Sequence, residues 1–204
     1  MKKKYYAVRI GRKPGIYNSW AECEKEVKGY SGAEYKSFLS IEEAKKYLNN
    51  QDNLGIGKDI KDLDDNEMIA YVDGSFKEGI RHYGYGVVLF SNEGKESYSD
   101  SGSEEYLLEM RNVAGEIKGA ITAMNIALEK NKDMLYLHYD YIGIEKWAIG
   151  EWKTNKEGTK EYKEYYDSIK NRLHVIFIKV KAHSGNIHNE EADALAKKSL
   201  EKHI

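Results

Sequence analysis

Apolar and polar positions over the second two thirds of the chain recur with the periods of strands and helices. Short apolar runs predict strands at residues 68–74, 82–91, about 95–102, 134–139 and 174–180. Apolar side chains at helical spacing predict a long helix from about 112 to 130, and shorter helices over 141–150, about 159–172 and about 189–201. Three strands followed by alternating helices and strands indicate an α/β fold, in which helices flank a mixed five-stranded sheet. The almost wholly apolar run 174–180 is typical of a strand at the centre of such a sheet.

The first 48 residues carry a shorter pattern of their own. Strands are predicted at 4–10 and 34–39. Ser19 is placed to cap a first helix, and Ser40 with Glu43 forms a capping-box pattern for a second. These elements predict a compact unit that is separate from the larger sheet.

The segment between the two patterns, residues 49–67, is rich in Asn, Asp and Gly and has no sustained period. Such a composition predicts a linker. We therefore expect a first domain over 1–48, a linker over 49–67 and a second domain over 68–204.

Composition narrows the class of protein. Charged residues make up 32% and aromatic residues 12% of the 204 residues, and no apolar run approaches the length of a membrane helix. We therefore expect a soluble, folded protein with no membrane partner. The N-terminus lacks the pattern of a secretion signal, and the single cysteine, Cys23, excludes an intrachain disulfide. Both features favour a cytoplasmic protein, which we expect to be a monomer.

Charge is unevenly distributed along the chain. Residues 1–48 hold eleven Lys and Arg against six Asp and Glu, whereas residues 49–204 hold twenty-one against twenty-eight. The first 21 residues contain six basic residues and no acidic one. A basic block attached to an acidic body indicates a module that binds a polyanion, although a solvated tail would show the same composition.

Four carboxylates stand at the ends of predicted elements. Asp73 and Asp140 end apolar strands, and Glu116 and Asp193 lie near the first turns of two helices. If they meet, like charges 4 Å apart repel by roughly 4 kcal/mol per pair. Bound divalent cations remove that penalty, and carboxylate oxygens suit Mg²⁺ or Mn²⁺. Taken singly, each residue has an ordinary alternative as a turn residue, a solvated helix charge, a helix cap or a surface acid.

Four motifs, in order, resemble a type 1 ribonuclease H domain. They are YVDGSF with the hairpin YGYGVVLF, then NVAGEIKGAITAMNIAL, LHYD and VKAHSGNIHNEEADALAKKS, and they span residues 68 to about 200. The resemblance implies the ribonuclease H fold and a catalytic set whose carboxylates hold two Mg²⁺ ions, with Mn²⁺ as an alternative. The catalytic residues that it assigns are Asp73, Glu116, Asp140, Asp193 and, on a loop, His183.

The activity that this resemblance implies is endonucleolytic hydrolysis of the RNA strand of RNA/DNA hybrids, which leaves 5′-phosphate and 3′-hydroxyl ends. Asp73 would bridge the two ions, Asp140 and Asp193 would hold one each, and Glu116 would support the second. His183 would move protons or assist product release, and its alternative is a loop histidine that makes one hydrogen bond.

The first 48 residues, from KYYAVRIGRKPGIYNSW onwards, are similar to the hybrid-binding, viroplasmin-like domain found ahead of many such nucleases. The resemblance implies a small α+β domain, a three-stranded antiparallel sheet with two helices, that binds RNA/DNA hybrids and possibly duplex RNA. Its nucleic-acid contacts map to Tyr6, Arg9, Arg12, Lys13, Trp20, Tyr35 and Lys36. Gly29 and Ser37 stand where some relatives have basic residues, which predicts a weaker grip on phosphate. Core packing is the alternative for Trp20 and Tyr35.

Polar residues beside the carboxylates are candidates to read 2′-hydroxyl groups, which only the RNA strand of a hybrid carries. They are Asn112 and the backbone amides around Gly74 and Ser75, and the resemblance adds Asn189 as a further nucleic-acid contact. Between 147 and 162 the chain lacks a lysine-rich extension that some relatives have, so the basic N-terminal unit is expected to supply much of the affinity. Two rival functions remain: a hybrid- or duplex-RNA-binding protein with an inactive nuclease fold, and an integrase-like or resolvase-like nuclease on the same fold.

Overall fold

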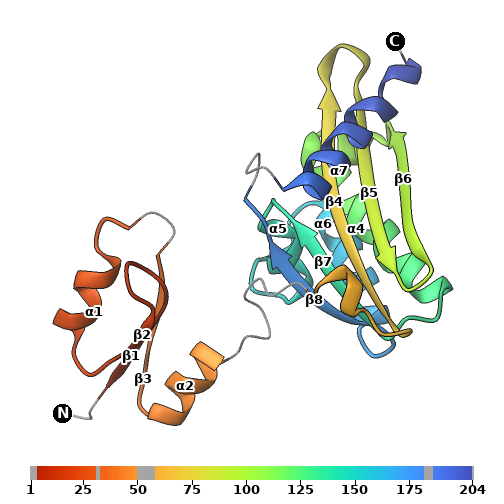
Figure 1. Ribbon diagram of the computed structural model, residues 1–204. Coiled ribbons are helices and arrows are strands. Elements are labelled where there is room, and N and C mark those ends of the chain that lie inside the picture. The colour runs from red at the N-terminus through yellow and green to blue at the C-terminus, as the bar shows by residue number, and fades with distance from the viewer. Residues whose placement is uncertain (1–3, 31–32, 50–57, 182–185, 204) are drawn as a thin grey trace. The chain divides into compact units, whose positions relative to one another are not determined.

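The computed structural model describes residues 4–30, 33–49, 58–181 and 186–203. The chain divides into two compact units, residues 1–56 and 57–204 (Figure 1). Each unit has its own buried apolar clusters. Among the helices of the described residues, none has the length and apolar character needed to cross a membrane.

The N-terminal unit is the expected small α+β fold. Its antiparallel sheet has the order β2-β1-β3, and its strands and helices are β1 (Tyr5–Ile10), β2 (Gly15–Tyr17), α1 (Trp20–Val27), β3 (Glu34–Phe38) and α2 (Ile41–Asn49). Ser19 begins α1 with a reciprocal capping box to Glu22. Val8, Cys23 and Val27 form the buried cluster, so the lone cysteine packs as a small apolar side chain.

The second unit contains the predicted mixed sheet of five strands, in the order β6-β5-β4-β7-β8. Antiparallel pairs join β4 to β5 and β5 to β6, and parallel pairs join β4 to β7 and β7 to β8. The bounds are β4 (Glu67–Lys77), β5 (His82–Ser91), β6 (Gly94–Gly102), β7 (Met134–Tyr139) and β8 (His174–Lys179).

The central place expected for the apolar strand at 174–180 is wrong, because β8 lies at an edge of the sheet. Val175 and Phe177 belong to the main buried cluster, and Ile178 is buried as well. Burial of its side chains, and not strand pairing on both sides, explains the apolar run.

Helices cover both faces of this sheet. The long helix α4 packs on β4 and β5 on one face, and α7 packs on β4, β5 and β6 on the other (Figure 1). The helices and short helical turns are η2 (Ile60–Asp62), η3 (Glu78–Ile80), α3 (Glu105–Leu108), α4 (Asn112–Glu129), α5 (Gly143–Ala148), α6 (Glu157–Ile169), α7 (Ile187–Ser199) and η4 (Glu201–His203).

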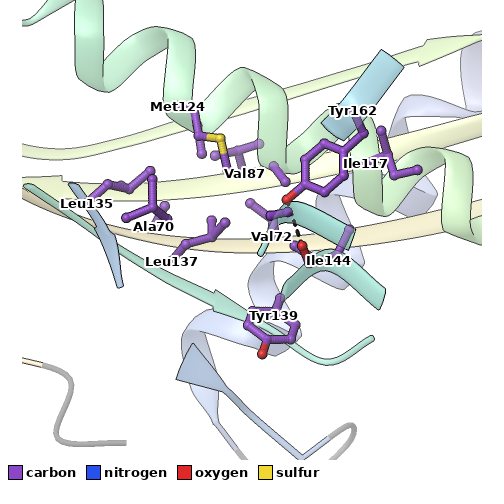
Figure 2. Packing of buried hydrophobic residues seen from close by; sticks show 14 of the residues in the cluster. Ala70, Val72, Val87, Ile117, Met124, Leu135, Leu137, Tyr139, Ile144 and Tyr162 are labelled. Atoms are coloured by element: carbon purple, nitrogen blue, oxygen red, sulfur yellow. Dashed lines mark hydrogen bonds between the residues drawn. The ribbon is translucent and has the colours of Figure 1, made fainter. Parts of the chain in front are cut away.

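The main core lies between the sheet and α4 (Figure 2). Alternate residues of β4, such as Ala70 and Val72, enter this cluster, whereas Ile69 and Tyr71 enter a second cluster on the face that carries α7. Tyr162 is fully buried, and its hydroxyl donates to the carbonyl of Ile144 at 2.9 Å. The two clusters hold α4 and α7 against opposite faces of the same strand.

Part of the segment expected to be a linker is folded. Residues 58–66 lead into β4 through η2 and pack on the second unit, and β4 itself begins at Glu67. Residues 50–57 of the expected linker lie outside the described residues.

Candidate active site

Three of the predicted carboxylates come together where the parallel pairing of the inner strands β4 and β7 ends. Asp73 lies on β4, Glu116 on α4 and Asp140 directly after β7, and each offers an oxygen within 4.8 Å of the others. Asp193 of α7 joins them in lining a cleft of about 420 Å³. The four acids are therefore neighbours in the fold, although they are spread over 120 residues of sequence.

Strand direction and two glycines produce this meeting. Since β4 and β7 are parallel neighbours, their carboxyl ends carry Asp73 and Asp140 to the same edge. Gly74 faces α4, where an added Cβ would lie 2.4 Å from the amide nitrogen of Glu116. Gly86 of β5 faces α7 in the same way, with an added Cβ only 2.1 Å from the carbonyl oxygen of Ala192. Both helices can approach the sheet closely because these two positions have no side chain.

The backbone amide of Gly74 organises two of the carboxylates. It donates to Oδ1 of Asp73 at 2.7 Å and to Oε1 of Glu116 at 3.1 Å. The other oxygen of Glu116, Oε2, is buried and has no hydrogen-bond partner among the described residues. A buried acceptor of this kind is costly unless something else satisfies it.

Burial and mutual repulsion strongly perturb the cluster. Burial, followed by the charges of Asp140 and Asp193, raises the pKa of Asp73 to about 7. Burial and the charge of Asp73 also raise the pKa of Glu116 well above its ordinary value. Asp193 is paired with Lys197, one turn further along α7, at 2.6 Å. Hard oxygen donors that repel each other, one of them an unpaired buried oxygen, fit a divalent cation.

The polar residues that were expected to contact nucleic acid beside the carboxylates do not all line the cleft. Ser75 and Asn112 line the cleft. Asn189 is 4% exposed and does not line it, and its side-chain oxygen accepts no hydrogen bond among the described residues. His183 lies outside the described residues.

Sequence reasoning missed three further residues that line the cleft, Phe76, Arg111 and Lys197. Arg111 caps α4 with a positive φ of 53°, which is unusual for a residue with a side chain. Its guanidinium lies 5.9 Å from the ring centre of Phe76 and pairs with Glu78 at 3.1 Å. A basic residue four positions after Asp193 was the available signal for Lys197.

A second hollow of about 350 Å³ adjoins the cleft. It is lined by Val113 and Tyr141, which directly follow Asn112 and Asp140 of the cleft, and by Trp147. Its outer lining includes Lys153 and Lys156, two of the three lysines that remain between 147 and 162. The third, Lys160, is exposed on α6.

The aromatic residues predicted to bind nucleic acid in the N-terminal unit form a row, in which Tyr6 is partly buried against the apolar cluster and the other two are exposed. The ring centres of Tyr6 and Trp20 are 5.8 Å apart, and those of Trp20 and Tyr35 are 5.6 Å apart. Trp20 and Tyr35 are 42% and 45% exposed, which contradicts core packing as their role. Lys36, next to Tyr35 on β3, is also exposed.

The basic residues of this unit divide into two groups. The guanidinium of Arg12 donates to the carbonyls of Lys25 and Lys28, at 2.9 and 2.8 Å, and so caps the end of α1. Lys13 is exposed. The side chain of Arg9 lies outside the described residues. Arg12 therefore has a structural role that sequence reasoning did not anticipate.

The strand order of the five-stranded mixed sheet, with helices on both faces, defines the second unit as a member of the ribonuclease H-like fold class. The family model described as RNase H matches residues 65–201, and the model described as Ribonuclease H1 N-terminal domain matches residues 4–48. The chain belongs to the ribonuclease H family.

Individual relatives match each unit separately. A ribonuclease H of Francisella tularensis subsp. novicida (strain U112) is 34% identical over 146 residues, which covers 66% of this chain and 91% of that protein. A ribonuclease H of Crithidia fasciculata is 52% identical over 48 residues, 24% of this chain and 10% of that protein. A ribonuclease H of Saccharomyces cerevisiae is 59% identical over 44 residues, which covers 22% of this chain and 13% of that protein. The chain thus matches only about a tenth of the length of the latter two relatives.

Solved structures match the second unit. RNase H1 of the archaeon Halobacterium salinarum NRC-1 aligns with a TM-score of 0.55 at 24% identity, over 67% of this chain and 98% of that one. LC11-RNase H1, solved in complex with an RNA/DNA hybrid, aligns with a TM-score of 0.54 at 20% identity, over 66% of this chain and 97% of that one. At these identities the likeness establishes the fold.

Proposed function

We propose that this protein cuts the RNA strand of RNA/DNA hybrids endonucleolytically, with two divalent cations, and leaves 5′-phosphate and 3′-hydroxyl ends. The observation that carries the proposal is the meeting of Asp73, Glu116 and Asp140 within 4.8 Å, with one oxygen of Glu116 buried and unpaired. Family membership and the hybrid named in the LC11-RNase H1 structure support the choice of substrate.

In this proposal, Asp73, Glu116, Asp140 and Asp193 hold the cations, Mg²⁺ by preference and Mn²⁺ as an alternative. When held there, the cations would supply an activated water and charge stabilisation for the leaving 3′ oxygen, so no side chain needs to act as a covalent nucleophile. The amide of Gly74 fixes the orientation of Asp73 and Glu116 before substrate arrives. His183 moves protons or assists product release.

Substrate recognition follows from what surrounds the carboxylates. Ser75 and Asn112, at the cleft wall, contact 2′-hydroxyls and so select the RNA strand. The adjoining hollow with Trp147 and its lysines receives the DNA strand by backbone contact, which is independent of base sequence.

The N-terminal unit supplies a second grip on the hybrid and, more weakly, on duplex RNA. Exposed Trp20 and Tyr35 stack against sugars or bases, and Lys36 contacts phosphate. The chain acts as a monomer in this scheme, because one molecule carries both the binding unit and the carboxylates.

One assay separates this enzyme from a binding protein with an inactive fold and from a nuclease that cuts DNA. Labelled RNA/DNA hybrid, duplex DNA and duplex RNA are each incubated with the full chain, in Mg²⁺ or in chelator. We expect cleavage of the hybrid's RNA strand alone, only with the cation, and none by Asp73→Asn, which should still bind the hybrid. Cleavage by Asp73→Asn, or of duplex DNA, would overturn the proposal.

A further inference from the structure

Residues 58–66, which we name the strap, fold onto the second unit although residues 58–64 lie outside both family models. The strap leads directly into β4 (Figure 1). Its contacts are of three kinds, and the first and third involve strands or the helix that carry the carboxylates.

The first contact is an ionic network at the start of β4, in which Glu67 is buried and Asp64 is exposed. The ammonium of Lys58 pairs with Asp64 at 2.7 Å and with Glu67. Glu67 also accepts from the backbone amide of Asp64 at 2.9 Å and from the hydroxyl of Tyr136 at 3.0 Å. Burial alone would raise the pKa of Glu67, but these donors hold it below its ordinary value. The network thus ties the first residue of the strap to β4 and β7.

The second contact is a buried lysine. Lys132 is 4% exposed, and its ammonium donates to the carbonyl of Asp65 at 2.6 Å and to Oδ1 of Asn92 at 3.1 Å. The amide of Asn92 donates in turn to the carboxylate of Asp65 at 2.7 Å. A buried ammonium that needs a strap carbonyl as an acceptor stabilises the docked strap.

The third contact is apolar, and it is made with a cluster that includes near sequence neighbours of Asp73 and Asp193. Ile60 and Leu63 pack against the second cluster of the unit, on the face of the sheet that carries α7. The buried members of that cluster are Ile69, Tyr71, Val88, Phe90 and Ala192. Tyr71 lies two residues before Asp73 on β4, and Ala192 directly precedes Asp193 on α7.

We infer that the strap is a positioning element for the carboxylate cleft, a role that rests on the proposed function of that cleft. Ile60 and Leu63 share with α7 the apolar surface of β4 and β5, so the docked strap supports α7 at the distance that places Asp193 beside Asp73. Without this support, α7 can repack on the exposed part of the cluster and move Asp193 away from its fellow ligands.

The test compares two full-length variants of the same segment. Ile60→Ser with Leu63→Ser removes the apolar contact, and Lys61→Ser with Asp62→Ser changes two exposed residues of the same turn as a control. Measurements are Mg²⁺ binding by calorimetry without substrate, hydrogen exchange of α7, and kcat and KM on a hybrid.

We expect the strap variant to bind Mg²⁺ about tenfold more weakly, at the lower end of the effects seen for residues behind metal ligands. Its α7 amides should exchange faster, and kcat should fall by a similar factor with KM within twofold. Mg²⁺ affinity and α7 exchange equal to the control would overturn the inference.

A second variant, Lys58→Met, guards against a folding failure, because it removes the ionic anchor and leaves the apolar contact in place. It should show a smaller loss in the same direction, and unchanged Mg²⁺ affinity would again contradict the positioning role. If Asp73→Asn still cleaved hybrid, the proposed function would fail, yet Mg²⁺ binding and α7 exchange would still decide the role of the strap.

Discussion

At the scale of single residues, the acidic cluster brings carboxylates close enough to share a cation, and their mutual repulsion lowers the stability of the folded chain. Asp73 and Glu116 are buried beside other carboxylates, and both have raised pKa values. A cation site built this way binds tightly because the repulsion that it relieves is already present in the folded chain.

The first prediction concerns pH and cation binding. Protons compete with Mg²⁺ for the cluster, so its apparent affinity for Mg²⁺ should fall as the pH drops through about 7, the pKa of Asp73. Calorimetric titrations between pH 6 and 8.5 would measure this. A constant affinity over that range would contradict the raised pKa.

The same shift predicts how stability depends on pH in chelator. The folded state holds the Asp73 proton more tightly than the unfolded state, so stability from this group is complete below the ordinary value of 3.8 and declines towards pH 7. Asp73→Asn should remove this decline and should therefore be more stable than the parent at pH 8, by roughly 1–3 kcal/mol. Chemical denaturation of both proteins at pH 5 and 8 measures the difference, and a less stable Asp73→Asn at pH 8 would refute it.

A further prediction at this scale separates structure from binding in the N-terminal unit. Arg12→Ala should destabilise that unit by about 1–2 kcal/mol, because two helix-end carbonyls lose a charged donor. Lys13→Ala, at an exposed neighbour, should weaken hybrid binding and leave stability unchanged. Unaltered unfolding of Arg12→Ala would point to a direct contact with nucleic acid instead.

At the scale of elements, the sequence predicted the pieces better than their places. Periodicity located the long helix over 112–130 and all five strands. One dominant core sets the apolar positions of the helix and of four strands, whereas β6 is largely exposed. It misplaced β8, since an edge strand with buried side chains has the same composition as a central one. It read the strap as linker, because the partners that fold it, among them Asn92 and Lys132, are distant in sequence.

The convergence of the acids could be anticipated from strand ends and helix starts. The close approach of α4 to Gly74 and of α7 to Gly86 could not. Nothing local distinguishes Gly74 and Gly86 from ordinary strand glycines until the helices that press on them are in place. The role of Arg12 could not be predicted for the same reason, because a side chain that caps a helix from a distant loop produces no periodic pattern in the sequence.

The close packing of α7 on Gly86 of β5 gives a prediction at the scale of elements. Gly86→Ala would place a methyl group 2.1 Å from the carbonyl of Ala192, so α7 must shift. We expect destabilisation of at least about 2 kcal/mol and a loss of Mg²⁺ affinity. Gly79→Ala, where no atom lies within 4 Å of the added group, is the matched control and should change neither. Equal behaviour of the two variants would mean that α7 does not depend on this contact.

At the scale of the whole molecule, the proposed function gives hybrid binding and chemistry to different units of one chain. Trp20→Ala should raise KM for long hybrids roughly tenfold, since base–aromatic stacking contributes about 1–3 kcal/mol, and should leave kcat unchanged. Tyr30→Ala removes another exposed aromatic of the same unit and serves as control. A fall in kcat with unchanged KM in Trp20→Ala would contradict the division of labour. Salt should raise KM more steeply for the parent than for Trp20→Ala if stacking brings the lysines to phosphate.

The separate buried clusters of the two units have a consequence for heating. Among the described residues, the cluster of Val8, Cys23 and Val27 is much smaller than the one beneath α4, and small cores melt early. Calorimetry should therefore record two endotherms, and no single melting temperature describes the chain. Between the two, a warmed sample would hold a competent nuclease that has lost its grip on long substrates and regains it on cooling.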